Sequence, residues 1–140
     1  MAVAAWLAAH PPAQTVLLGG TAALGAEVEA GVPEPLRVAG GERAETAAAV
    51  ATQLWRVGQV EGRRLLALNA YREDGWAFGL AAAGLADDAD APVLVVGDDV
   101  PPATGDLVTG CGEVDLLLIG DESVIGAAAA GQLDTLDDTC

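Results

Sequence analysis

The stretch "VLLGGTAALGA", Val16 to Ala26, is an apolar run that passes through two glycines into helix-forming residues. A shift of 101 residues without gaps places it over "LLIGDESVIGA", Leu117 to Ala127. Leucine, glycine, glycine and alanine recur at equivalent positions, and these are the strand core, the turn and the helix start. A period near 100 residues predicts that the chain holds the tail of one repeat unit and nearly all of a second.

Short apolar runs along the chain predict strands buried on both faces. They are Val16–Leu18, Leu36–Ala39, Leu65–Asn69, Val93–Val96 and Leu116–Ile119. Helix patterns alternate with them, at Ala22–Ala30, Glu42–Val57, Gly75–Ala86, Pro101–Thr109 and Glu122–Gln132. The clearest helix carries one apolar stripe of Ala47, Val50, Ala51 and Leu54. This alternation predicts a three-layer α/β fold with a mainly parallel sheet and helices on both faces, like a Rossmann or flavodoxin unit.

The repeat also predicts the organisation of the chain. Residues 1–35 are interpreted as the C-terminal part of a preceding unit, 36–135 as one nearly complete unit, and 136–140 as a tail. We expect these parts to pack as a single compact domain. The opening "MAVAAWLAAHPP" lacks the basic region and the cleavage site of a signal peptide, so we interpret it as a short helix stopped by Pro11.

Charge is distributed unevenly. The net charge is −15, and all six arginines precede residue 73, while the last 68 residues carry fifteen acids and no base. Such a field repels phosphate backbones and anionic lipids, so we expect no binding to nucleic acid or to anionic membrane surfaces. No segment approaches the roughly 20 apolar residues that cross a bilayer, so membrane insertion is not expected either. We interpret most of the acidic residues as solvated surface charges.

Catalytic and metal chemistry find little support. The chain has one Ser, one His and two Cys, so a Ser–His nucleophile pair and a His/Cys zinc site are not expected. No cofactor or resident metal is predicted. Asp98 and Asp121 follow the ends of predicted strands, where an α/β crevice opens, and are the candidates for weak cation binding. Whether Cys111 and Cys140 pair is left open by the sequence.

The arginines and the first glycine loop each admit two interpretations. Arg37, Arg43 and Arg72 flank predicted strands and could bind an anionic ligand, or could pair with acids such as Glu42, Glu45 or Glu73. Gly19, Gly20 and Thr21 could cradle a phosphate between a strand and a helix. However, the loop matches neither common nucleotide motif, and glycine follows four of the strands, which favours tight turns.

The segment "RVAGGERAETAAAVA", Arg37 to Ala51, resembles the opening of the bacterial cell wall binding repeat 2 family, close to R-[IV]-A-G-x-D-R-Y-x-T-A. "LAAAGLADDADAPVLVV", Leu80 to Val96, resembles the middle of that repeat, and both glycine turns resemble its closing V-x-V-L-G-G-x-x-A-V-S. The resemblance covers nearly the whole chain. Departures from the family pattern occur at polar or turn positions: Glu42, Ala44, Ala77, Phe78 and Gly84.

The resemblance implies a non-catalytic α/β module that anchors surface proteins to anionic cell-wall polymers, through units that usually occur in threes and pack together. By resemblance, the location is the cell surface, and the partners are a wall polymer, other repeat units or a second copy. Arg37, Arg43 and Arg72 are the expected polymer ligands, directly or alongside divalent cations. The departures from the family pattern also allow a second interpretation, in which this unit is degenerate and serves only as a scaffold. The alternative function is a small α/β protein that binds a nucleotide or phosphate metabolite through the glycine loop.

Overall fold

The computed structural model describes residues 2–59, 63–110 and 114–137. Its helices and strands alternate as α1 (Ala2–Ala9), β1 (Thr15–Leu18), α2 (Ala26–Ala30), β2 (Pro35–Val38), α3 (Arg43–Leu54), β3 (Arg64–Asn69), α4 (Gly75–Ala89), β4 (Val93–Val96), α5 (Pro102–Thr109), β5 (Asp115–Leu118) and α6 (Ala127–Asp137). All predicted strands form, within one residue at each end. The α/β class is confirmed.

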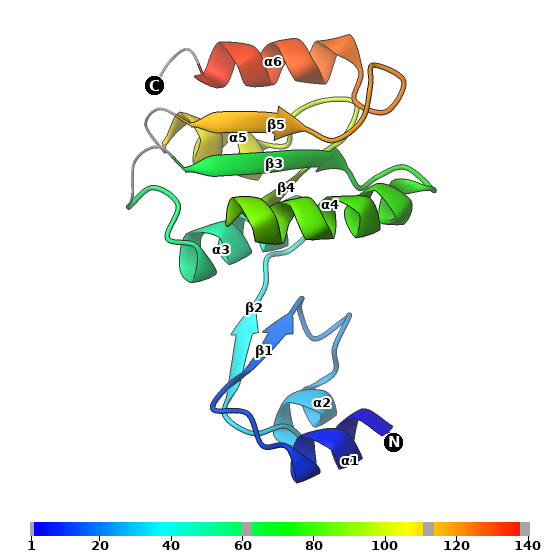
Figure 1. The fold of residues 1–140 in the computed structure, drawn as a ribbon, viewed down its shortest axis with the longest axis vertical. Coiled ribbons are helices and arrows are strands. Elements are labelled where there is room, and N and C mark those ends of the chain that lie inside the picture. The colour runs from blue at the N-terminus through cyan, green and yellow to red at the C-terminus, as the bar shows by residue number, and fades with distance from the viewer. Residues whose placement is uncertain (1, 60–62, 111–113, 138–140) are drawn as a thin grey trace.

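The strands are divided between two parallel sheets. β1 pairs with β2, with Leu17 opposite Arg37, while β3 lies between β4 and β5 in a second sheet. Figure 1 shows that β1, β2, α1 and α2 form an N-terminal lobe, and that the chain crosses from β2 to α3 into a larger lobe. The strand that opens the predicted unit 36–135 therefore pairs with the end of the preceding part. The proposed unit boundaries remain predictions.

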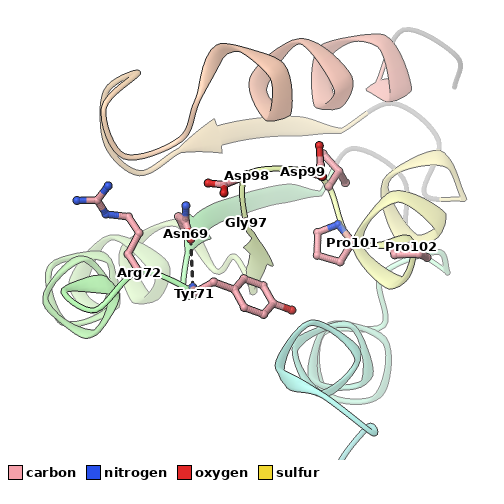
Figure 2. Close-up of a pocket in the computed structure, with 9 residues that line it drawn as sticks. Asn69, Tyr71, Arg72, Gly97, Asp98, Asp99, Pro101 and Pro102 are labelled. Carbon is pink, nitrogen blue, oxygen red and sulfur yellow. Dashed lines mark hydrogen bonds between the residues drawn. The ribbon is translucent and has the colours of Figure 1, made fainter.

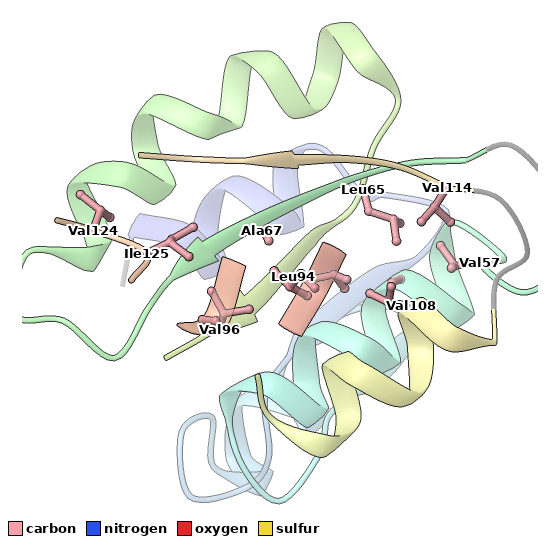
Figure 3. Close-up of a cluster of buried hydrophobic side chains, with 12 residues drawn as sticks. Val57, Leu65, Ala67, Leu94, Val96, Val108, Val114, Val124 and Ile125 are labelled. Carbon is pink, nitrogen blue, oxygen red and sulfur yellow. The ribbon is translucent and has the colours of Figure 1, made fainter. Parts of the chain in front are cut away.

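The larger lobe has three layers. α4 packs against one face of β3, and α3, α5 and α6 contribute buried residues on the other face (Figure 1). Figure 3 shows the resulting core, in which Leu65, Leu94 and Val96 of the sheet meet Val108 of α5. Each such side chain contributes about 1.5–3 kcal/mol when removed from water. The N-terminal lobe has a much smaller interior, built mainly on Leu17 and Val38.

Two predicted helices begin later than expected. Instead of starting at Ala22 and Glu122, α2 begins at Ala26 and α6 at Ala127, because a hydrogen-bonded turn precedes each. In the first turn the amides of Ala23 and Leu24 donate to the Gly20 carbonyl, and in the second those of Val124 and Ile125 donate to the Asp121 carbonyl. These residues are 101 positions apart. The sequence repeat is therefore also a repeat of backbone geometry.

The glycines that start these turns have positive φ, +114° at Gly19 and +122° at Gly120. A side chain is strained in this conformation, which explains why glycine recurs there. The glycine at each of these two corners thus serves the turn itself.

The predicted apolar stripe of α3 is only partly correct. Of its four residues, Ala51 is fully buried and Ala47 and Val50 are half-buried, whereas Leu54 is 39% exposed at the last turn. The helix ends at Leu54 rather than Val57, because Arg56 takes a positive φ of 57° and turns the chain back toward the core at Val57.

Some predictions fall at the limits of the described residues. Of the predicted tail, Leu136 and Asp137 belong to α6, and 138–140 lie outside the described residues. Cys111 and Cys140 lie outside them as well. Within the part of the chain that is described, the helices are too short or too polar to span a bilayer.

Candidate functional site

A crevice of about 610 Å³ opens at the carboxyl ends of β3 and β4. Its walls are the loop from Asn69 to Arg72 and the loop from Gly97 to Pro102. After β3 the chain enters α4 on one face of the sheet, and after β4 it enters α5 on the other (Figure 1). Such a reversal between neighbouring parallel strands leaves a gap at the carboxyl ends of the strands, where α/β proteins bind ligands. Figure 2 shows Arg72 at one end of this crevice and the two prolines at the other.

Asn69 holds the floor of the crevice in place. It is only 3% exposed, its amide nitrogen donates to the Val124 carbonyl at 3.0 Å, and its side-chain oxygen accepts the Tyr71 amide at 3.1 Å (Figure 2). It therefore ties the loop after β3 to the turn after β5. Sequence reasoning missed this role; the available signal was a polar residue that ends an otherwise apolar strand.

Tyr71 joins the crevice to the start of α3. The Arg43 guanidinium lies 5.0 Å from the centroid of its ring and also donates to the Ala70 carbonyl, while the Tyr71 hydroxyl donates to Glu42. Desolvation and the hydrogen bond to Glu42 raise the pKa of Tyr71 above its usual 10.0. The phenol therefore stays protonated at neutral pH and acts as a hydrogen-bond donor.

Arg72 links the turns after β3 and β5. It donates to both oxygens of Asp74, at 2.9 and 3.2 Å, and to the Ser123 carbonyl at 2.8 Å. The hydrogen bond to Asp74 is the main cause of the raised pKa of Arg72, and the charges of Asp121 and Asp98 add to it. The same pair lowers the pKa of Asp74. Arg72 is thus a fixed positive charge between acids from three loops.

The predicted cation ligands are both near this charge. Asp98 lines the crevice, and Asp121 accepts the amide and hydroxyl of Ser123 at 2.9 and 2.6 Å, which lowers the pKa of Asp121. Among the described residues, no three His, Cys, Asp or Glu side chains gather as a metal site. Binding of a cation at Asp98 and Asp121 stays a prediction.

The three predicted polymer ligands are not brought together. Arg72 lines the crevice, and Arg43 lies behind it against the Tyr71 ring. Arg37 lies in the N-terminal lobe, paired with Glu29 at 3.1 Å and bound to the Gly19 carbonyl at 2.7 Å. The ion pairs of the described arginines also use acids other than the predicted Glu42, Glu45 and Glu73. They are Arg37–Glu29, Arg63–Asp90, Arg64–Asp115 and Arg72–Asp74.

The glycine loop of the alternative interpretation lies in the N-terminal lobe, away from the crevice (Figure 1). The Gly19 carbonyl accepts from Arg37, the Gly19 amide donates to Val38, and the Gly20 carbonyl caps the next turn. The five-residue α2 follows Thr21 only after that turn. Phosphate binding by Gly19, Gly20 and Thr21 stays untested.

An exposed aromatic ring beside the crevice was also missed from the sequence. Trp76, in the first turn of α4, is 71% exposed and borders a surface depression with Arg72, Glu73 and Asp74. A tryptophan this open, next to a fixed guanidinium, offers a flat apolar surface and a charge to one ligand. Helical periodicity alone does not distinguish such a ring from a core residue.

Comparison with known proteins agrees with this architecture. The chain is similar to two solved structures, Cwp6 from Clostridium difficile (TM-score 0.80, 18% identity, 95% of this chain and 21% of that chain) and Cwp8 from Clostridium difficile (TM-score 0.66, 22% identity, 87% and 20%). It spans about a fifth of each. No curated protein sequence matches it. The model of the cell wall binding domain 2 (CWB2) family matches residues 37–130. With two thirds of its length matched over the opening motif, the crevice and the closing turn, the chain belongs to the cell wall binding domain 2 family.

Proposed function

We propose that this chain is a non-catalytic module that attaches to an anionic cell-wall glycopolymer at the crevice between β3 and β4, and that it acts at the cell surface. The observation that carries the proposal is that Tyr71 and Arg72 both line that crevice, with the Arg43 guanidinium lying over the Tyr71 ring. Arg37 stays a separate prediction in the other lobe.

The side chains around the crevice are chemically suited to a charged sugar chain. Guanidinium groups make charge-assisted hydrogen bonds to phosphate and carboxylate. Asp74 and Ser123 hold Arg72 in one orientation, and a ligand would meet the N–H groups of Arg72 that these two residues do not use. The exposed rings of Tyr71 and Trp76 offer apolar faces with polar rims, which suit sugar rings. Figure 2 shows that the residues lining the crevice come from the ends of two neighbouring strands, with Arg72 and the prolines on opposite sides.

The catalytic alternative finds no support in the geometry. The sole histidine, His10, stacks on Trp6 in the N-terminal lobe, while the sole serine, Ser123, donates to Asp121 in the larger lobe. The Asp121 carboxylate is within hydrogen-bond reach of the Ser123 hydroxyl, but its lowered pKa makes it a weak general base, and the imidazole of His10 lies in the other lobe. The raised pKa of Tyr71 keeps its hydroxyl protonated at neutral pH, so little phenolate is available there as a base or nucleophile.

Retention on purified cell wall tests the proposal. Changing Arg43 and Arg72 together to alanine is expected to reduce retention about tenfold or more, since a hydrogen bond to a charged group is worth about 1.5–3 kcal/mol. Arg63→Ala with Arg64→Ala is the matched control, because it removes the same number of charges at the opposite end of β3. Unchanged retention by the Arg43 and Arg72 double variant, with folding confirmed by circular dichroism, would refute the site. A separate Arg37→Ala variant tests the remaining arginine.

Chelation separates direct binding from cation bridging. If the arginines carry the contact, EDTA leaves retention unchanged and rising salt weakens it. Loss of retention in EDTA, restored by Ca²⁺, would instead assign the contact to Asp98 and Asp121.

A further inference from the structure

β5 has one edge that is paired and one that is not. The amides of Asp115 and Ile119 donate to the carbonyls of Arg63 and Ala67, so this set of backbone groups faces β3. Because backbone groups alternate along a strand, the amides of Leu116, Leu118 and Gly120 face the opposite edge. Among the residues that the structure describes, no strand pairs with β5 there.

The internal repeat shows what fits that edge. β1 is the counterpart of β5, and the turns that follow both strands have the same hydrogen bonds and the same positive-φ glycine. In β1, the amides of Thr15 and Gly19 donate to Glu34 and Val38, the carbonyls on the β1 side of β2. Adding 101 to 15 and 19 gives Leu116 and Gly120, which face the open edge of β5. The edge that β1 uses for β2 is thus the edge that β5 leaves open.

We propose that this edge of β5 binds the opening strand of another repeat unit, a segment of the Pro35–Val38 type, in parallel and in the register of the β1–β2 pair. Each unit then lends its first strand to the sheet of the unit before it. The larger lobe gains a fourth parallel strand, in the order β4-β3-β5 followed by the incoming strand. This inference is independent of the polymer site.

Side chains at the edge agree with this occupant. In the β1–β2 register Leu36 lies opposite Val16 and Val38 opposite Leu18, so the incoming strand would place these side chains opposite Leu117 and Ile119. Leu117 is 40% exposed on the open strand, which leaves apolar surface for a cross-strand neighbour to cover. The incoming arginine would reach the Gly120 carbonyl, as Arg37 reaches Gly19. Glu29 has Ala130 as its counterpart, so the ion pair would not be reproduced.

The same geometry accounts for the small N-terminal lobe. β1 corresponds to an edge strand of a larger sheet, and its side away from β2 corresponds to the side on which β5 meets β3. In the proposed arrangement a neighbouring unit would supply the strands on that side and cover Val16 and Leu18, which are exposed in this structure. Repeat proteins bury their cores between neighbours in this way. Open strand edges are otherwise a liability for aggregation.

Amide hydrogen exchange on an extended chain tests the proposal. A second copy of residues 33–42 is joined after Cys140 through a flexible linker of about 15 residues, which reaches roughly 20 Å and keeps the strand at high local concentration. The amides of Leu116, Leu118 and Gly120 are expected to exchange at least about tenfold more slowly than in the unextended chain. The amide of Ile119, which already donates to Ala67, is the internal reference.

The matched control is the same extension with Leu36→Pro and Val38→Pro in the added copy only. These prolines remove the amides that face β5 in the proposed register, so fast exchange should return. Equal rates with and without the unaltered extension would overturn the proposal. So would protection that survives both prolines, or protection of the three amides already present in the dilute, unextended chain.

Discussion

At the scale of single residues, the crevice depends on side chains that join loops far apart in the sequence. Asn69 and Arg72 follow β3, yet their partners Val124 and Ser123 lie in the turn after β5. Removing the buried side-chain amide of Asn69 would cost more than the net free energy of its two hydrogen bonds, because the partner groups would be left buried and unsatisfied. These two residues therefore set the shape of the site.

Tyr71 allows a clean measurement at this scale, because it is the only tyrosine in the chain. Desolvation and the hydrogen bond to Glu42 raise its folded-state pKa above 10.0, so this contribution to stability is present below pH 10.0 and is lost as the pH rises through the folded pKa. We expect its absorbance at 295 nm to titrate above pH 10.0 in the native protein and near 10 in urea. Glu42→Gln should bring the native midpoint down. Equal native and unfolded midpoints would contradict the Tyr71–Glu42 contact.

At the scale of elements, α4 is the sole helix that covers its face of β3 among the described residues (Figure 1). Two of its glycines, Gly75 at its first position and Gly84 in its second half, have opposite roles. A Cβ on Gly75 would lie 2.6 Å from the Asn69 carbonyl oxygen, whereas a Cβ on Gly84 would meet nothing within 4 Å. Gly75 lets the helix start close against the crevice loop. Gly84 only adds backbone freedom on the exposed side.

Alanine at these two positions should change stability in opposite directions. Gly84→Ala is expected to stabilise by about 0.5–1 kcal/mol through helix propensity. Gly75→Ala is expected to destabilise by about 1–3 kcal/mol, because backbone atoms of Asn69 and Ala70 must move. Urea unfolding of the two variants measures both effects, and each serves as the other's control. A stabilising Gly75→Ala would show that the loop is not held against the helix.

At the scale of the whole molecule, charge opposes compactness. The net charge is −15, and the second half of the chain has no base, so acids repel one another across the larger lobe. The ion pairs are largely exposed, and pairs of that kind contribute about 0–1 kcal/mol each. Repulsion should therefore outweigh them at low salt.

Raising NaCl from about 10 to about 150 mM, which shortens the screening length from about 30 to about 8 Å, should raise the melting temperature. The matched variant is Asp87→Asn with Asp88→Asn, two exposed acids in the last turns of α4, and it should be more stable at low salt and less sensitive to added salt. Calorimetry measures both. A melting temperature that falls with salt would mean that the ion pairs dominate.

The sequence by itself determined the order of helices and strands, their parallel character, the 101-residue repeat and the family, because these follow from local periodicity, glycine turns and short motifs. It also placed Arg43, Arg72, Asp98 and Asp121 at strand ends or helix starts. Only the tertiary structure decided that β2 pairs with β1 in a separate sheet, and that Arg37 is remote from Arg72. Strand pairing and loop contacts depend on backbone groups and side chains distant in sequence, so no local pattern encodes them. The same holds for Asn69, whose partner is 55 residues away.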